Sequence, residues 1–209
     1  MFRALSLALA LTVTALPAAA EPLSPVQTAA LSARLFEVGR VQRDPLLVLA
    51  AARLRKQLAP SEDTTRRAEA GYAAPAQAPL DWQDMAALAE ELAAGDDAIL
   101  GLIDDLRAET TKGVITGPVY NIGSLGPRKT DTYARIDFRG GEYAEVYVEA
   151  RSSVDLNLTV TDAQGRLVCA DTDRSHIAYC GWRPDATGAF TLKVENRGNA
   201  ATGYALMTN

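Results

Sequence analysis

The spacing of hydrophobic residues changes near residue 110, and this change divides the chain into two kinds of structure. Before that point, apolar residues recur at every third or fourth position, as they do on one face of a helix. After it, they alternate with polar residues, as they do in half-buried strands. The order predicts a segregated α+β protein, with helical hairpins or a bundle in residues 21–110 and an antiparallel β-sandwich in residues 111–209.

The first twenty residues have the pattern of a secretory signal peptide. Arg3 precedes an apolar run of about a dozen residues, and a series of small residues ends at Ala20. A membrane anchor is the alternative, but the run is shorter than the roughly 20 residues that a spanning helix needs. We therefore predict cleavage after Ala20, no membrane span, and a periplasmic or secreted protein. In such a compartment Cys169 and Cys180, the two cysteines of the chain, are expected to form a disulfide.

Four helices are predicted in the first half, each beginning at a residue that caps helices well. Gly39 is expected to end the first helix, and residues 59–80, rich in alanine and proline, are expected to form a linker. The two resulting hairpins are weakly alike, which fits either a duplication or coincidence in an alanine-rich stretch. The expected caps are Ser24, Asp44, Asp81 and Asp96.

About eight short strands are predicted in the second half, with glycine-containing turns between several of them. Ala134, Ile136 and Phe138 alternate with polar residues, so they are expected to share one buried face. Eight strands without helical interruption indicate a β-sandwich or jelly roll. The expected strands cover residues 114–120, 134–138, 146–148, 154–160, 166–170, 177–182, 190–194 and 204–208.

Three segments of this half resemble the bacterial pre-peptidase C-terminal (PPC) domains. Residues 153–165 (SVDLNLTVTDAQG) are similar to the family's alternating strand and its Asp-x-x-Gly turn. Residues 186–196 and 203–206 are similar to its last two strands. The resemblance implies a secreted β-sandwich of a kind usually appended to extracellular hydrolases and associated with secretion or substrate attachment. It does not cover the helical half, which has no His-Glu-x-x-His motif.

Composition and charge narrow the possible functions. A formal net charge of -5, one histidine and two cysteines argue against nucleic acid as a partner and against zinc-finger or iron–sulfur sites. Residues 21–67 carry a formal +3 and residues 68–110 a formal -9, so the helices either attract one another or present unrelated solvated faces. A surplus acidic face would steer a basic partner. Its expected members are Glu90, Glu91, Asp96, Asp97, Asp104 and Asp105.

One loop contains the residue types of a hydrolytic triad, Ser175 and His176 near Asp171 and Asp173. Adjacent residues on an extended chain point to opposite sides, so Ser175 and His176 are not expected to pair. A solvated loop histidine is the simpler interpretation. The spacing of the cysteines is also unlike that of a redox Cys-x-x-Cys motif.

Two further groups have both a binding and a structural interpretation. Oxygen atoms of Asp155, Asn157, Asp171 and Asp173 could hold calcium, although residues of this type also form turns. A second group of aromatic side chains could form a binding surface for polymers or glycans, although packing in the core or at its rim explains them better. This group consists of Trp82, Trp182, Tyr143 and Tyr147.

The sequence therefore predicts an exported, non-enzymatic binding protein whose partner is a protein or an envelope polymer. The alternative function is that of an accessory or inhibitory partner of a secreted hydrolase. No catalytic, cofactor-binding or metal-binding residue is assigned, and the oligomeric state is left open.

Overall fold

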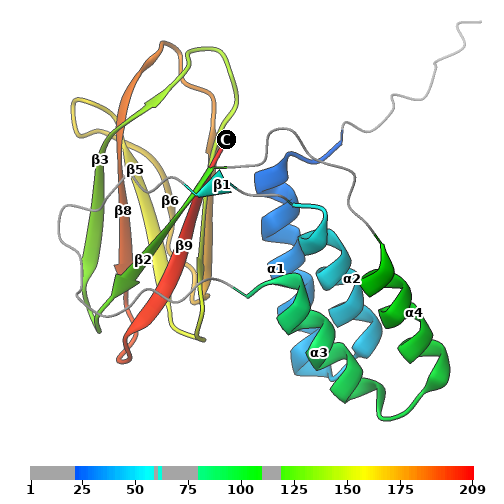
Figure 1. Cartoon of the computed structure of the whole chain (residues 1–209). Helices are drawn as coiled ribbons and strands as arrows, with labels where there is room; N and C mark the ends of the chain where they lie inside the picture. The colour runs from blue at the N-terminus through cyan, green and yellow to red at the C-terminus, as the bar shows by residue number, and fades with distance from the viewer. Residues whose placement is uncertain (1–21, 59–60, 63–79, 110–118) are drawn as a thin grey trace, which may run out of the picture.

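Four helices followed by a β-sandwich form the described part of the chain, as the sequence predicts (Figure 1). The computed structural model describes residues 22–58, 61–62, 80–109 and 119–209, so the predicted signal peptide and most of the predicted linker lie outside the described residues. The helices are α1 (Pro25–Gln42), α2 (Pro45–Lys56), α3 (Trp82–Ala93) and α4 (Asp97–Ala108). The strands are β1 (Ser61–Glu62), β2 (Val119–Leu125), β3 (Thr130–Phe138), β4 (Ala144–Ala150), β5 (Leu156–Thr161), β6 (Leu167–Asp171), β7 (Ile177–Trp182), β8 (Gly188–Asn196) and β9 (Thr202–Thr208).

Each helix begins at the capping residue that the sequence predicts. The side chain of Ser24 accepts a hydrogen bond from the backbone N–H of Gln27, and the other three caps accept equivalent bonds from the first turns of their helices. A cap of this kind typically stabilises a helix by about 1 kcal/mol. The local sequence therefore determines where all four helices start.

Gly39 does not end α1, contrary to the sequence prediction. The helix continues to Gln42 and ends at Arg43, which has a left-handed backbone conformation. Gly39 lies against α2, where a Cβ atom would come within 2.8 Å of Cγ2 of Val48. The glycine therefore permits the close approach of two helices.

The strands form two sheets with jelly-roll connectivity. One sheet has the order β1-β2-β9-β4-β7 and the other the order β3-β8-β5-β6. Apart from the short β1, the first strand pairs with the last, the second with the last but one, and so on inward. The predicted jelly-roll-like sandwich is thus confirmed, and β1 adds two residues parallel to the edge strand β2.

Two strands differ in detail from the sequence prediction. A bulge in β3 shifts the register between Tyr133 and Ile136, and Arg135 takes a φ of 61°. Tyr133 is therefore buried and Ala134 exposed, so the expectation that Ala134 shares the inner face with Ile136 is wrong. Strand β2 extends to Leu125, beyond the predicted end, and residues 114–118 lie outside the described part of the chain.

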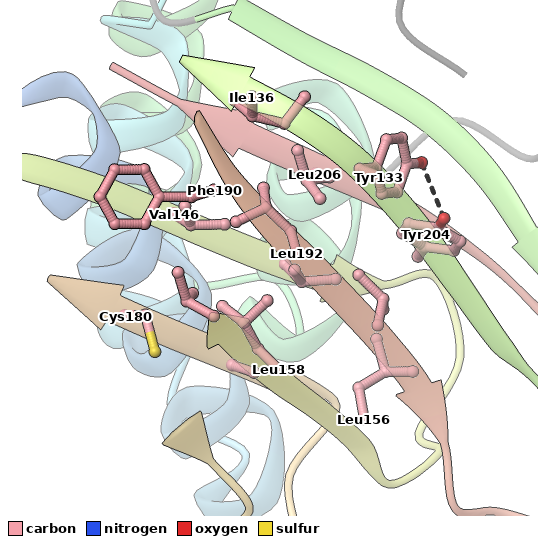
Figure 2. Packing of buried hydrophobic residues seen from close by; sticks show 14 of the residues in the cluster. Tyr133, Ile136, Val146, Leu156, Leu158, Cys180, Phe190, Leu192, Tyr204 and Leu206 are labelled. Atoms are coloured by element: carbon pink, nitrogen blue, oxygen red, sulfur yellow. Dashed lines mark hydrogen bonds between the residues drawn. The ribbon is translucent and has the colours of Figure 1, made fainter. Parts of the chain in front are cut away.

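The core between the sheets contains one buried polar chain among aliphatic side chains (Figure 2). The hydroxyl of Tyr204 donates to Oδ2 of Asp131 at 2.6 Å. Because that proton is used, the hydroxyl of Tyr133 is the donor in the 2.7 Å bond to Tyr204. Burial raises the pKa of Asp131, although the bond from Tyr204 opposes this shift.

The outer face of the β2-β9-β4-β7 sheet is also buried, because the helices cover it. Every residue of β4 and β9 is buried. Tyr147 and Met207 point away from the sandwich core and pack in a cluster with Val26 and Ala29 of α1. Strands of this sheet are thus buried on both faces, as strands of a central layer are.

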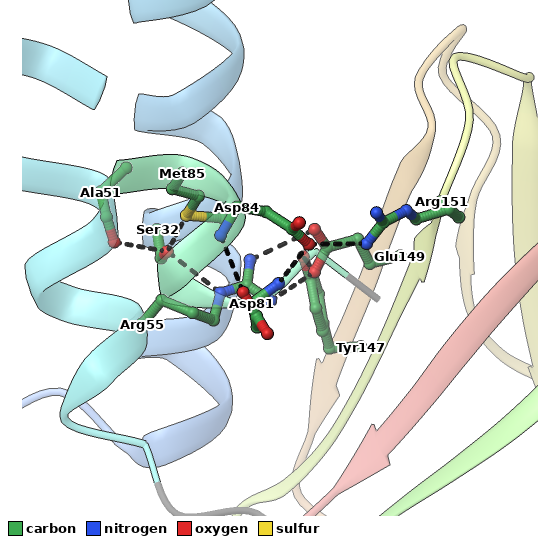
Figure 3. A network of polar contacts seen from close by, with 9 residues as sticks. All are labelled: Ser32, Ala51, Arg55, Asp81, Asp84, Met85, Tyr147, Glu149 and Arg151. Atoms are coloured by element: carbon green, nitrogen blue, oxygen red, sulfur yellow. Dashed lines mark hydrogen bonds and ion pairs between the residues drawn. The ribbon is translucent and has the colours of Figure 1, made fainter. Parts of the chain in front are cut away.

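A buried ion pair lies in this interface (Figure 3). Arg55 of α2 donates two hydrogen bonds to the Glu149 carboxylate, at 2.8 and 3.2 Å, and the two side chains are only 7% and 2% exposed. The Tyr147 hydroxyl donates to the same carboxylate, and Arg55 Nε donates to the Ser32 hydroxyl. Burial by itself would lower the pKa of Arg55, but the Glu149 carboxylate raises it above its usual value. Arg55 is therefore charged within the buried interface.

Replacing one member of this pair leaves the other charge buried without its partner. We expect Arg55→Met to lower the free energy of unfolding by about 3–5 kcal/mol, and the double variant Arg55→Met/Glu149→Leu to recover most of that loss. Urea unfolding of the wild type, both single variants and the double variant measures this coupling. Additive losses in the double variant would show that the two charges do not depend on each other.

Asp131 is expected to make stability depend on pH. Its pKa is raised in the folded state, so its contribution is fully present below the unfolded pKa of about 3.9 and is lost as the pH rises through the folded pKa. The variant Asp131→Asn keeps an acceptor for Tyr204 and should lose less stability than the wild type over that rise. Unfolding midpoints at a series of pH values measure the difference, and Asp137→Asn, on the exposed face of the same strand, controls for the lost charge. Parallel pH profiles for the wild type and Asp131→Asn would contradict the prediction.

Candidate functional site

An open groove lies at the end of the sandwich where β7 leads into β8. We call it the Trp182 groove, and its volume is about 650 Å³. Its lining comes from the β5–β6 turn, the beginning of β6, the end of β7 and the loop that leads into β8. The groove thus combines segments that are distant in sequence and adjacent in the jelly roll.

Aromatic side chains form its base. The rings of Trp182 and Phe190 line the groove, with their centroids 5.4 Å apart. Phe138 packs edge-on against Trp182, with a centroid distance of 4.8 Å. The Nε1 atom of Trp182 is buried and has no hydrogen-bond acceptor among the described residues. Packing on both phenylalanines holds the indole in one position.

The β5–β6 turn forms one wall. One oxygen of Asp162 accepts hydrogen bonds from the backbone N–H groups of Gln164 and Arg166, both at 2.9 Å. Its other oxygen accepts from Nε of Arg166 at 2.6 Å. Gly165 has a φ of 76°, a conformation that this tight turn requires and that glycine adopts without strain. The wall is therefore a rigid turn that presents amide and guanidinium groups.

The loop from Arg183 to Thr187 forms the opposite wall. Its Pro184 carbonyl accepts from the backbone N–H of Gly141, and the Thr187 hydroxyl accepts from the N–H of Gly140. These bonds attach the loop to the β3–β4 turn. The lining contains two acidic residues, Asp162 and Asp185, and two basic residues, Arg166 and Arg183, so its formal charges cancel. A neutral polar ligand suits such a groove better than an ion.

The predicted disulfide between Cys169 and Cys180 is confirmed. It joins β6, at the edge of one sheet, to β7, at the edge of the other, so it crosses the sandwich. Closing a loop of this length contributes roughly 3 kcal/mol in the chain-entropy model. Val168 and Trp182 line the groove within two residues of the cysteines, so the disulfide also supports the site.

Ser175 and His176 have separate surroundings. The Ser175 hydroxyl accepts a hydrogen bond from the backbone N–H of Ile177, as in a turn. His176 lies near Glu37 of α1, whose pKa it helps to lower after the larger effect of the Arg40 hydrogen bond. Ser175 and His176 are thus adjacent in sequence, but Ser175 stabilises a turn and His176 lies beside α1.

Among the four residues with side-chain oxygens that could hold calcium, Asp171 stabilises the local backbone instead. Asp171 accepts from the N–H groups of Tyr179 and Asp173, at 2.9 and 3.4 Å. The pKa of Asp173 is raised by burial and by the nearby charges of Asp171 and Asp155, with Arg34 opposing. Within the described residues, no group of three or more Asp, Glu, His and Cys side chains is arranged to hold a metal ion.

The four aromatic residues considered as one binding surface lie in different places. Tyr147 is buried between the sheet and α1, and Trp82 packs under the ammonium group of Lys56 in the helical half. Tyr143 is exposed just before β4, where its hydroxyl lies against Gly181 of β7, and Trp182, the next residue of β7, lines the groove. They do not form a common surface.

Half of the predicted acidic face has local functions in the helices. Asp96 caps α4, and Arg107 pairs with Glu90 and Asp104. The other three members of the face are exposed and form no side-chain ion pair within the described residues. They are Glu91, Asp97 and Asp105.

Sequence analysis did not identify the Trp182 groove as a site. The sequence predicts the Asp-x-x-Gly turn that ends at Gly165 and gives Trp182 both a packing and a binding interpretation, but it does not bring these features together. Their convergence depends on the pairing of strands across the jelly roll, which a single sequence does not specify.

Comparison with known proteins gives distant structural likeness alone. No protein-family model and no curated protein sequence matches the chain. The pre-peptidase C-terminal domain of a Bacillus anthracis collagenase is 12% identical with a TM-score of 0.29, over 41% of this chain and 91% of that chain. PliG of Aeromonas hydrophila, a periplasmic inhibitor of g-type lysozyme, is 18% identical with a TM-score of 0.32, over 49% and 91%. These matches concern the C-terminal sandwich and carry no information about function.

Among the described residues, no helix is both long enough and apolar enough to cross a bilayer.

Proposed function

We propose that this protein is an exported, non-enzymatic binding protein that attaches to an envelope polymer through the Trp182 groove. The observation that carries the proposal is the composition of the groove, an aromatic base between two polar walls whose charges balance. The leader-like first twenty residues and the disulfide support export, because structural disulfides persist in oxidising compartments.

The chemistry of the groove favours a neutral glycan among envelope polymers. The C–H faces of a sugar ring pack on an indole such as that of Trp182. Sugar hydroxyls both donate and accept, so they can bond to guanidinium, carboxylate and amide groups together. Arg183 and Asp185, both exposed on the same loop, present two of these groups. An extended polymer also suits the open shape of the groove.

Insoluble chitin, an uncharged polymer of N-acetylglucosamine, is the probe for this proposal. We expect the mature protein to sediment with chitin, and the double variant Arg183→Ala/Asp185→Ala to bind about tenfold more weakly, because two hydrogen-bonding groups are lost. Lys193→Ala, exposed on β8 away from the groove lining, is the matched control and should bind as the wild type does. Equal binding by the wild type and the double variant, or no binding by the wild type, would contradict the proposal.

A further inference from the structure

A second groove lies in the helical half, between α2 and α4. Arg53 pairs with Glu109 at 2.7 Å at the C-terminal ends of the two helices, and Leu46 and Leu102 line the same groove before those ends. Lys56 donates to the carbonyl of Leu106, which fastens the end of α4 to α2. We call this space, of about 690 Å³, the α2–α4 groove.

Leucines line the groove and remain open to solvent. Leu46 and Leu102 are 52% and 49% exposed, whereas Leu106 below them is 4% exposed. The lining is mostly apolar along its length, and Leu49 is half-buried within it. Two leucines this exposed add little to the bundle core, and together with the apolar lining they form a contiguous patch of the kind found at binding sites.

The charged side chains that line the groove, Arg53, Asp105 and Glu109, sum to -1, and α4 carries further acidic residues beside it. Residues 81–109 contain nine acidic side chains and one basic side chain. Arg107 is paired with Glu90 and Asp104, while Asp105 on the groove rim forms no ion pair within the described residues. The potential at the rim is therefore negative and attracts a basic partner.

We propose that the α2–α4 groove docks a basic amphipathic helix of a partner protein. Leu46 and Leu49 are three residues apart, and Leu102 and Leu106 four, so each helix presents an apolar ridge along the groove. A third helix packs between two such ridges when its own apolar residues repeat every three or four positions. Lysine or arginine on the sides of that helix would meet the acidic rim. This site is separate from the Trp182 groove and does not depend on glycan binding.

The test uses the mature protein and a synthetic peptide of about 18 residues, or five helical turns, with leucines on one helical face and lysines on the others. A peptide of the same composition in shuffled order, without an apolar face, is the control for charge. Binding is measured by fluorescence anisotropy at about 0.05 M and about 0.5 M salt. We expect the amphipathic peptide to bind more tightly than the shuffled peptide, and its affinity to fall as salt rises.

Variants localise this binding. Leu102→Ser should weaken it about tenfold or more, because a leucine that becomes buried on docking is lost. Asp105→Asn should reduce the salt dependence. Val38→Ser, at an exposed apolar position of α1 outside the groove, should leave binding unchanged, and circular dichroism of each variant shows whether it is folded. Equal binding of both peptides, equal binding by Leu102→Ser, or a dimer of the wild type that Leu102→Ser dissociates would each overturn the proposal.

Discussion

The arrangement of the molecule depends on the burial of one sheet from both sides. The β2-β9-β4-β7 sheet packs on the other sheet through one face and on the helices through the opposite face. The second contact contains the ion pair between Arg55 and Glu149, and both side chains are buried from water. Each charge therefore needs the other to remain stable in this interface. A second contact between the halves, from Arg151 to Asp84 at 2.9 Å, lies nearer to solvent. The helices are thus held against the sandwich by apolar packing and by the paired charges of Arg55 and Glu149.

Local sequence signals predicted the helix starts and the jelly-roll-like sandwich, because capping side chains and the alternation of apolar and polar residues act over short distances. The disulfide could be predicted because the chain has two cysteines, which leave one possible pairing. The burial of β4 could not be predicted in the same way. Its outward residues Glu145, Tyr147 and Glu149 look like a solvated face, and they are buried only because helices from another part of the chain cover them. The bulge that turns Ala134 outward and the close helix contact at Gly39 likewise depend on tertiary packing. The Trp182 groove arises from strand pairing over long sequence distances.

The two proposed recognition surfaces belong to different halves and have different chemistry. The Trp182 groove is aromatic, polar and balanced in charge, and it lies at one end of the sandwich. The α2–α4 groove is apolar with an acidic surrounding, and it lies in the helical bundle. The interface between sheet and helices uses α1, Arg55 of α2 and Asp84 of α3, none of which lines either groove. If the halves form one rigid unit, the protein can hold a basic helix at a fixed position relative to an envelope polymer.

The central claim is that the helical half and the sandwich unfold together because they share a buried interface. The chain has two tryptophans, so Trp82→Phe leaves Trp182 as a fluorescence probe of the sandwich, while far-ultraviolet circular dichroism reports mainly the helices. The decisive measurement is urea unfolding of this variant followed by both signals. We predict that both signals change together with one midpoint. The reason is that unfolding of the helices would expose the outer faces of β4 and β9 to water. Loss of the helical signal at a lower urea concentration than the Trp182 signal would show that the halves are independent and would contradict the account.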